Sequence, residues 1–198
     1  MHPAERYADL VADPAAFRSA CDRPLPTVVR VNTDAVSPET ALAAFAEAGI
    51  DTTTRTWSDT VIELETDRPG CTWPYVLGWV HGQEEISQLP ARVLGPEPGE
   101  RILDAAAAPG GKATQLAALQ HGTGLVVAND VNLGRLAALR SNADRLGITN
   151  MAVTQQDARV YSVAPFDFDR FDRVLVDAPC SGEGTVRKNP GVIAEWSR

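Results

Sequence analysis

The stretch that decides the fold covers residues 101–130 and runs RILDAAAAPGGKATQLAALQHGTGLVVAND. Arg101 to Ala105 and Leu125 to Asn129 are short apolar runs typical of buried strands. Between them, Lys112 to Gln120 consists mostly of helix-forming residues and follows a Pro-Gly-Gly turn. A strand, a helix and a second strand in this order predict two parallel strands joined by a right-handed crossover.

The same alternation continues toward the C-terminus. We expect a helix from Asn132 to Leu146, ended by Gly147, and further strands at Met151 to Gln155 and Arg173 to Val176. The buried side of that helix is expected to carry Leu133, Leu136, Ala143 and Leu146. Strands alternating with helices predict an α/β fold with a parallel, doubly wound, Rossmann-like sheet. Ligands of such sheets lie beyond the carboxyl ends of the strands.

The first third of the chain has a different pattern. Residues 1–23 are expected to form a helical lead-in, and residues 24–66 a small α+β unit. Its expected elements are a strand at Thr27 to Val31, a helix capped by Ser37 and extending to Ala48, and two strands, Thr52 to Trp57 and Thr60 to Leu64, around a Ser58-Asp59 turn. This order fits part of a ferredoxin-like module, which often binds RNA but need not. We therefore expect one domain over residues 1–80 and a second over residues 81–198.

Composition favours a globular protein. Hydrophobic residues make up 44% of the 198, and no run approaches the ~20 apolar residues that cross a bilayer. The first residues lack the basic and apolar segments of a signal peptide, so we expect none. The three cysteines form no C-x-x-C pair. We therefore expect neither a metal site nor a disulfide framework, and a cytoplasmic location.

The charge balance is unusual for a protein that contacts nucleic acid, which normally relies on clustered Lys and Arg. Net charge is −8, and of 18 basic residues only Lys112 and Lys188 are lysine. An acidic, lysine-poor surface suits a protein that works in near-saturating salt, where charge steering acts over a few ångströms. We hypothesise a halophilic source; the alternative is an ordinary acidic cytosolic protein.

The loop after the first strand of the predicted sheet consists of small residues from Asp104 to Lys112. Such a loop lets a ligand approach the backbone and meet the N–H groups of a helix start. It is neither a G-x-G-x-x-G loop nor a Walker A loop, because Ala106 and Ala113 stand where the latter needs Gly and Ser or Thr. A plain strand-to-helix turn is the alternative.

The next two strand ends each present an acid. Asp130 is placed to accept hydrogen bonds from ribose hydroxyls, and Asp157 to accept one from the amine of an adenine. A helix N-cap is an equally good interpretation of Asp130, and a cap or turn residue is the ordinary role of Asp157. The spacing of Asp130 from the first loop favours the ribose role, whereas the adenine role of Asp157 depends only on agreement with the other loops.

The loop after the fourth strand, Asp177 to Thr185, combines an acid, a thiol at Cys180 and a glycine-rich segment. Carbon 5 of cytosine is a poor nucleophile, and enzymes overcome this by adding a thiolate to carbon 6. A neighbouring acid then hydrogen-bonds the ring nitrogen. Asp177 and Cys180 have the right side chains for parts of this scheme. A small buried residue is the commonest alternative for an isolated Cys.

At these residues the chain resembles the RsmB/Nop/Sun family of RNA 5-methylcytosine methyltransferases. The strongest points are the segments 104–112 and 177–185. The supporting segments are Pro24 to Pro26, Arg30 to Thr33, Gln83 to Ser87, Ala128 to Asp130 and Gln156 to Ala158. The chain departs from the family pattern at Ala106, usually Cys, and at Ala113, usually Thr.

The resemblance implies S-adenosyl-L-methionine as cofactor and rRNA or tRNA as partner, with no metal. It implies that Ala106, Ala107, Ala108, Pro109, Gly110, Gly111 and Lys112 wrap the methionine part of the donor. It further implies that Asp130 binds the ribose, Asp157 the adenine, and Asp177 both donor and cytosine. In the family, the cysteine matching Cys180 helps release the product.

The attacking cysteine of the family lies in a later motif, which these 198 residues do not contain. The resemblance therefore predicts a truncated chain that holds the first four strands of the sheet, with the fourth strand as an unprotected edge. Two alternatives stay open. The chain is a non-catalytic fragment that binds donor or RNA, or it methylates an amine or small molecule and needs no thiol.

Overall fold

The structure is a computed structural model that describes Glu5 and residues 7–180, 182–189 and 191–192. Ser181 of the fourth loop and residues 193–198 lie outside the described residues. Two compact units are present, one formed by residues 27–178 and the other by residues 1–26 together with 179–198. No helix among the described residues is long and apolar enough to span a membrane.

The unit that contains both termini has short helices. They are η1 (Ala8–Leu10), α2 (Pro14–Asp22) and η5 (Glu183–Thr185). Asp13 caps α2 by accepting a hydrogen bond from the Ala16 N–H, with Pro14 at the first helical position. Arg187 donates to the backbone oxygens of Arg23 and Pro24, at 2.8 and 2.9 Å. The predicted helical lead-in is confirmed at η1 and α2.

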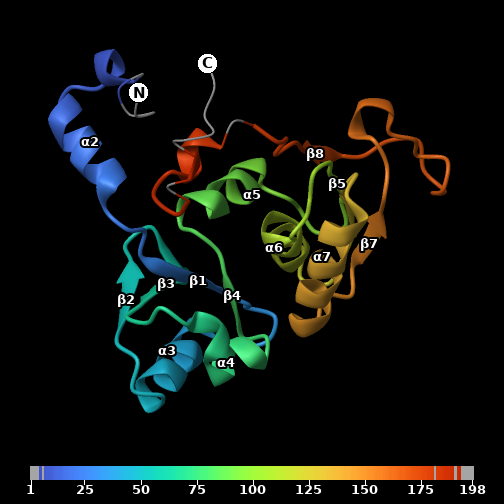
Figure 1. Cartoon of the computed structure of the whole chain (residues 1–198). Helices are drawn as coiled ribbons and strands as arrows, with labels where there is room; N and C mark the ends of the chain where they lie inside the picture. The colour runs from blue at the N-terminus through green and yellow to red at the C-terminus, as the bar shows by residue number, and fades with distance from the viewer. Residues whose placement is uncertain (1–4, 6, 181, 190, 193–198) are drawn as a thin grey trace. The chain divides into compact units, whose positions relative to one another are not determined.

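The larger unit begins with a small antiparallel sheet (Figure 1). Its elements are β1 (Thr27–Val31), α3 (Pro38–Glu47), β2 (Thr52–Arg55), β3 (Ser58–Leu64), η2 (Pro69–Cys71), α4 (Trp73–Val76) and β4 (Val80–Gly82). The strand order is β2-β3-β1-β4, the order of a ferredoxin-like sheet. Val29, Phe45 and Ile62 are fully buried in its core. Ser37 caps α3 as predicted, accepting a hydrogen bond from the Thr40 N–H.

One turn and one strand of this sheet differ from expectation. The predicted Ser58-Asp59 turn is wrong, because β2 ends at Arg55 and β3 already begins at Ser58. Ser58 is buried, and its hydroxyl accepts a hydrogen bond from Arg92 at 2.6 Å. This tertiary contact outweighs the local turn preference of a Ser-Asp pair. Strand β4 has three residues and no periodicity to predict it; pairing with β1 defines it.

The second half of the larger unit is a parallel sheet with order β7-β6-β5-β8. Its elements are η3 (Ile86–Gln88), α5 (Leu89–Leu94), β5 (Arg101–Asp104), α6 (Gly111–Leu119), β6 (Leu125–Asn129), α7 (Leu133–Arg145), β7 (Met151–Thr154), η4 (Ala158–Val160) and β8 (Arg173–Leu175). The predicted parallel α/β sheet with four strands is confirmed.

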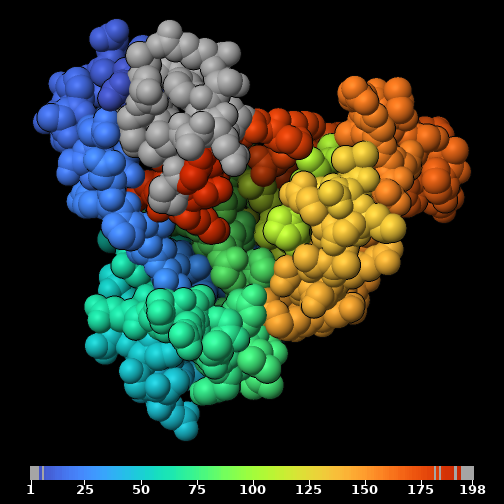
Figure 2. All heavy atoms as spheres, viewed as in Figure 1, coloured from blue at the N-terminus to red at the C-terminus, as the bar shows by residue number. Residues whose placement is uncertain are grey.

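The two faces of this sheet are covered differently. Ile102 and Val126 pack against α5 and α6, whereas Leu103 and Val127 point the other way and pack on Phe168. In the described residues, helices therefore cover one face, and the segment 156–172 between β7 and β8 covers the other. This segment, orange in Figure 2, protrudes beyond the rest of the sheet and is held by stacked and edge-on phenylalanines.

The buried apolar side chains of helix α7 begin one turn later in the sequence than predicted. Leu136, Ala143 and Leu146 are buried as expected, and fully buried Leu139 joins them. The prediction for Leu133 is wrong, because its side chain is 60% exposed. Leu133 follows the N-cap Asn132, whose side chain accepts from the Arg135 N–H. The first turn therefore lies beyond the apolar part of the sheet.

Polar contacts join the two sheets into one unit. The Asn32 amide donates to the backbone oxygens of Gly78 and Leu146, at 3.0 and 2.9 Å. Arg145 donates to the backbone oxygens of Tyr75 and Val80, at 2.6 and 3.0 Å, and its guanidinium lies 3.9 Å from the Tyr75 ring centroid. These side chains satisfy carbonyls near the ends of α4 and α7 and at the start of β4. A domain boundary near residue 80 stays a prediction.

Candidate functional site

The strand order places four acids along one edge of the parallel sheet. Asp104 ends β5, and Asp130, Asp157 and Asp177 follow the ends of β6, β7 and β8. Because the strands are parallel, all four lie at the carboxyl edge, in the order Asp157, Asp130, Asp104, Asp177. This is the edge at which ligands of such sheets bind.

The small-residue loop after β5 is held closely against its neighbours. The Ala105 N–H donates to the Leu175 oxygen at 2.9 Å, and the Ala107 N–H donates to the Asn129 oxygen at 2.7 Å. Within the loop, Ala106 and Pro109 remain accessible, and the Ala108–Pro109 peptide is cis. The loop is therefore a fixed wall between β5 and α6.

Helix α6 can start at this loop because residue 110 is glycine. Gly110 has φ 108°, and a Cβ there would lie 3.3 Å from both Cα and Cγ of Leu139. The first N–H groups of α6, from Gly111 onward, have no partner within the helix and open toward the carboxyl edge. They form a site suited to an anionic group.

Asp104 is the most unusual residue of the edge. Its side chain is 1% exposed, and neither carboxylate oxygen has a hydrogen-bond partner of ordinary geometry among the described residues. Burial raises the pKa of Asp104 to about 7, opposed by the nearby Ala106 N–H and the charge of Lys112 and reinforced by the charges of Asp177 and Asp130. A buried carboxyl without a partner is costly, and a cationic ligand would satisfy it.

Lys112 and Asp177 form an ion pair beside Asp104. The Lys112 Nζ lies 2.7 Å from the Asp177 Oδ2, with the lysine side chain largely buried and the aspartate 58% exposed. The pair links the first turn of α6 to the end of β8. More than half of the Asp177 side chain stays accessible while Lys112 holds one of its oxygens.

Asp130 is already engaged with the loop. It is 2% exposed and accepts hydrogen bonds from the Ala108 N–H at 3.3 Å and the Asn132 N–H at 2.8 Å. Arg135, whose side chain is 47% exposed, pairs with it at 3.3 Å. The N-cap interpretation of Asp130 is wrong, because Asn132 caps α7 and Asp130 accepts from the N–H of Asn132 instead. The ribose contact stays a prediction.

Asp157 follows β7, the outermost strand on the side of the sheet opposite β8. Its carboxylate accepts from the Arg159 backbone N–H and side chain, both at 3.0 Å, and Arg159 lowers the pKa of Asp157 to about 2. The carboxylate is thus charged and partly accessible. Its predicted contact with adenine stays a prediction.

Asn129 also contributes to this edge, although its role was not among those predicted from the sequence. It is fully buried, and its amide donates to the backbone oxygens of Ala105 and Gln156, at 3.1 and 2.9 Å. Its side-chain oxygen accepts from the Gln156 N–H at 2.9 Å. Asn129 therefore ties the first loop to the third. An amide that ends an otherwise apolar strand is the signal in the sequence.

Cys180 belongs to the other compact unit and is exposed. The alternative of a small buried cysteine is therefore wrong for this position. The predicted catalytic partners Asp177 and Cys180 fall on either side of the division between the units. Among the described residues, no group of three His, Cys, Asp or Glu side chains is arranged to hold a metal ion.

The parallel sheet and the four acids at its carboxyl edge are the features of a methyltransferase-type domain. The family model described as "16S rRNA methyltransferase RsmB/F" matches residues 91–198. Ribosomal RNA small subunit methyltransferase F of Citrobacter koseri is 41% identical over 189 residues, which cover 91% of this chain and 39% of that protein. The chain belongs to the RsmB/F family of S-adenosylmethionine-dependent RNA cytosine-5 methyltransferases. It spans about two fifths of the length of the curated relatives it matches.

Solved structures agree with this fold. A methyltransferase homolog protein from Pyrococcus horikoshii has a TM-score of 0.75 and 28% identity, covering 93% of this chain and 65% of that one. NSun6 from the same organism has a TM-score of 0.78, covering 91% of this chain and 71% of that one. At 19% identity, the second likeness concerns the fold alone.

Proposed function

We propose that the chain binds S-adenosyl-L-methionine at the carboxyl edge of its parallel sheet and serves the methylation of cytosine carbon 5 in ribosomal RNA. The observation that carries the proposal is the buried, unpartnered carboxyl of Asp104 beside a loop whose turn into α6 needs glycine at position 110. Membership of the RsmB/F family supports it. An rRNA substrate also makes the cytoplasm the expected location.

The residues of the edge fit the donor. When bound, S-adenosyl-L-methionine supplies an electrophilic methyl group on a sulfonium. Its methionine part carries an ammonium and a carboxylate. The Asp104 carboxyl suits the cationic part, and the free N–H groups at the start of α6 suit the carboxylate. We assign residues 106–112 to this part of the donor.

The remaining acids suit the nucleoside part. We assign Asp130 to the ribose hydroxyls, because its exposed partner Arg135 can move into solvent and free an oxygen. We assign Asp157 to the adenine amine, because its carboxylate is charged and partly accessible. Both assignments follow the order of the strands, which separates the methionine and adenine ends of the edge.

Asp177 is assigned to the junction between donor and cytosine. Lys112 holds one of its oxygens, and the exposed side of the carboxylate is available to a ring nitrogen. The exposed Cys180 thiol is assigned to product release, as the family resemblance implies. Attack on carbon 6 belongs to a cysteine in a later family motif, which these 198 residues do not contain.

Donor binding tests the proposal directly. Isothermal titration of the 198-residue chain with S-adenosyl-L-methionine should show binding at one site. Lys112→Arg should weaken it, because a planar guanidinium does not replace a compact ammonium at the Asp177 contact. Arg140→Lys, on the exposed side of α7, is the matched control and should bind as the unaltered chain does. No heat of binding for the unaltered chain would contradict the proposal.

A methyl-transfer assay separates the enzyme from a binding fragment. Because the attacking cysteine of the family is absent from these residues, we expect the chain alone to bind donor without transferring tritiated methyl groups to small-subunit rRNA. Transfer by the chain alone would show that this cysteine is dispensable. Transfer to an amine or small molecule, unaffected by Cys180→Ala, would instead favour the thiol-independent alternative.

A further inference from the structure

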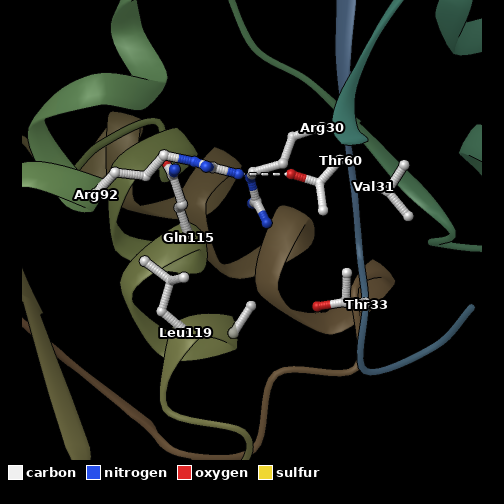
Figure 3. Close-up of a pocket in the computed structure, with 8 residues that line it drawn as sticks. Arg30, Val31, Thr33, Thr60, Arg92, Gln115 and Leu119 are labelled. Atoms are coloured by element: carbon white, nitrogen blue, oxygen red, sulfur yellow. Dashed lines mark hydrogen bonds between the residues drawn. The ribbon is translucent and has the colours of Figure 1, made fainter. Parts of the chain in front are cut away.

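A pocket opens between the small antiparallel sheet and the helices of the parallel sheet (Figure 3). Arg30, Thr33 and Thr60 line it from the small sheet and the turn after β1, and Arg92 and Gln115 line it from α5 and α6. None of these residues belongs to the carboxyl edge at which the donor is proposed to bind. The pocket therefore needs an explanation of its own.

Arg30 brings a buried positive charge to this pocket. Its side chain is 5% exposed, its Nε donates to Gln83 at 3.0 Å, and its Nη2 donates to the Thr114 hydroxyl at 3.1 Å. Both acceptors are neutral, and no carboxylate contacts the guanidinium within the described part of the chain. Burial and the charges of Arg92 and Arg145 lower the pKa of Arg30 to about 10, and the charge of Asp34 opposes this only weakly. The guanidinium stays protonated at neutral pH, and no described carboxylate serves as its counter-ion.

Arg92 adds a second guanidinium from the opposite wall. Figure 3 shows it extending from α5 across the pocket to the Thr60 hydroxyl. Its Nη2 donates to the hydroxyls of Ser58 and Thr60, at 2.6 and 2.8 Å, and again no carboxylate pairs with it among the described residues. Two guanidiniums that share a pocket and meet only neutral acceptors repel each other. A bound anion would offset this repulsion and supply the negative partner that both guanidiniums lack among the described residues.

The surroundings indicate which anion fits. The Arg92 guanidinium lies 5.2 Å from the ring centroid of Trp57, an aromatic side chain that is 40% exposed. Arginine is well matched to phosphate oxygens, and an exposed aromatic ring beside a phosphate site is the arrangement that single-stranded RNA uses. The chain as a whole carries a net charge of −8, so this local positive pocket is not part of a generally basic surface.

We propose that the Arg30–Arg92 pocket binds one backbone phosphate of the RNA substrate, with the strand passing Trp57. The proposal rests on the proposed function, because it takes its ligand from an RNA methyltransferase. It adds a contact to RNA that is separate from the donor edge. It also gives the small sheet a specific role, since Arg30, Trp57 and Thr60 belong to that sheet and its turns.

The test measures RNA affinity by fluorescence anisotropy, using a labelled, unstructured RNA of about 12 nucleotides and the full 198-residue chain. Arg92→Gln should weaken binding roughly tenfold, as expected for one charged hydrogen-bonded contact. The plot of log affinity against log salt should become shallower by about 0.7, the value for one single-strand phosphate. Arg92→Lys keeps the charge and should lose less. Arg140→Gln removes one exposed charge from α7 and should match the unaltered chain.

Each alternative outcome has a defined meaning. Equal RNA affinities for Arg92→Gln and Arg140→Gln would overturn the inference, as would an unaltered chain that does not bind the RNA. A further outcome is that inorganic phosphate raises the melting temperature of the unaltered chain but not that of Arg92→Gln. If the two proteins also bound RNA equally well, the pocket would be a free-phosphate site and the RNA assignment would be overturned. Circular dichroism of each variant excludes misfolding. Donor titration of the same variants keeps the two proposals apart, because Arg92→Gln should bind S-adenosyl-L-methionine normally.

Discussion

Replacing Asp104 with asparagine should make the protein more stable at alkaline pH while weakening its hold on the donor. Asp104 is buried, lacks a hydrogen-bond partner and has a pKa raised to about 7 from its usual 3.8. Between these two values the folded protein keeps a proton that the unfolded chain has released. Its stability therefore falls as pH rises through this interval and stays low above pH 7.

The size of the effect follows from the same shift. Each pH unit in that interval removes about 1.4 kcal/mol, so raising the pH from 5 to 8 should cost the unaltered protein about 3 kcal/mol through Asp104. Asp104→Asn cannot ionise and should not show this loss. The unfolding free energies of both proteins, measured in urea at the two pH values, give the difference directly, and groups that titrate in both cancel.

Two results would count against this reasoning. An Asp104→Asn protein with the same pH dependence as the unaltered chain would show that Asp104 is not protonated in the folded state. An unchanged affinity for S-adenosyl-L-methionine would show that the carboxyl does not meet the donor. Asp59→Asn changes an exposed acid on β3 and serves as the control, since it should alter neither quantity.

The remaining predictions concern packing and solvent. Gly78→Ala should destabilise by about 4 kcal/mol or more, because its Cβ would lie 2.0 Å from the Arg145 oxygen. Gly49→Ala has a similar φ, 71° against 75°, but nothing within 4 Å, and should cost about 1 kcal/mol in thermal unfolding. Leu139→Ala, at a fully buried position, should cost about 2–5 kcal/mol, whereas Leu133→Ala, 60% exposed, should cost less than about 0.5 kcal/mol in urea unfolding. If the acidic, lysine-poor composition reflects a halophilic source, the melting temperature should rise from low to molar KCl; a flat curve would refute that hypothesis.

Much of the fold could be predicted because periodicity and tertiary structure agree. Strand Leu125 to Asn129 has the predicted bounds, and α6 is within one residue of them, since alternating faces and glycine stops are local signals. Strand β4 and helix α5 have only a few residues each, so local pattern does not define them. The exposure of Leu133 also depends on where the sheet ends, which the helix sequence does not contain.

The candidate site was predictable in position but not in detail. Parallel strands bring Asp104, Asp130, Asp157 and Asp177 to one edge, and the alternation of strands and helices in the sequence predicted this shared edge. The order of the strands within the sheet was not predicted. The amide of Asn129 at a strand end is visible in the sequence, but its partners are carbonyls of two separate loops, and the sequence does not place those loops. The charge of Arg30 is likewise informative only because no carboxylate among the described residues pairs with it in the fold.

The contacts of Asn32 and Arg145 with the backbone of the opposite half have a consequence for how the larger unit opens. Asn32 of the small-sheet half satisfies the Leu146 carbonyl at the end of α7, and Arg145 of the parallel-sheet half satisfies the Val80 carbonyl in β4. Separating the halves would therefore leave buried hydrogen-bond acceptors in both halves without donors at the same time. Slow amide exchange should consequently be lost together in both sheets, as one cooperative opening, and a piece cut near residue 80 should fail to retain native protection.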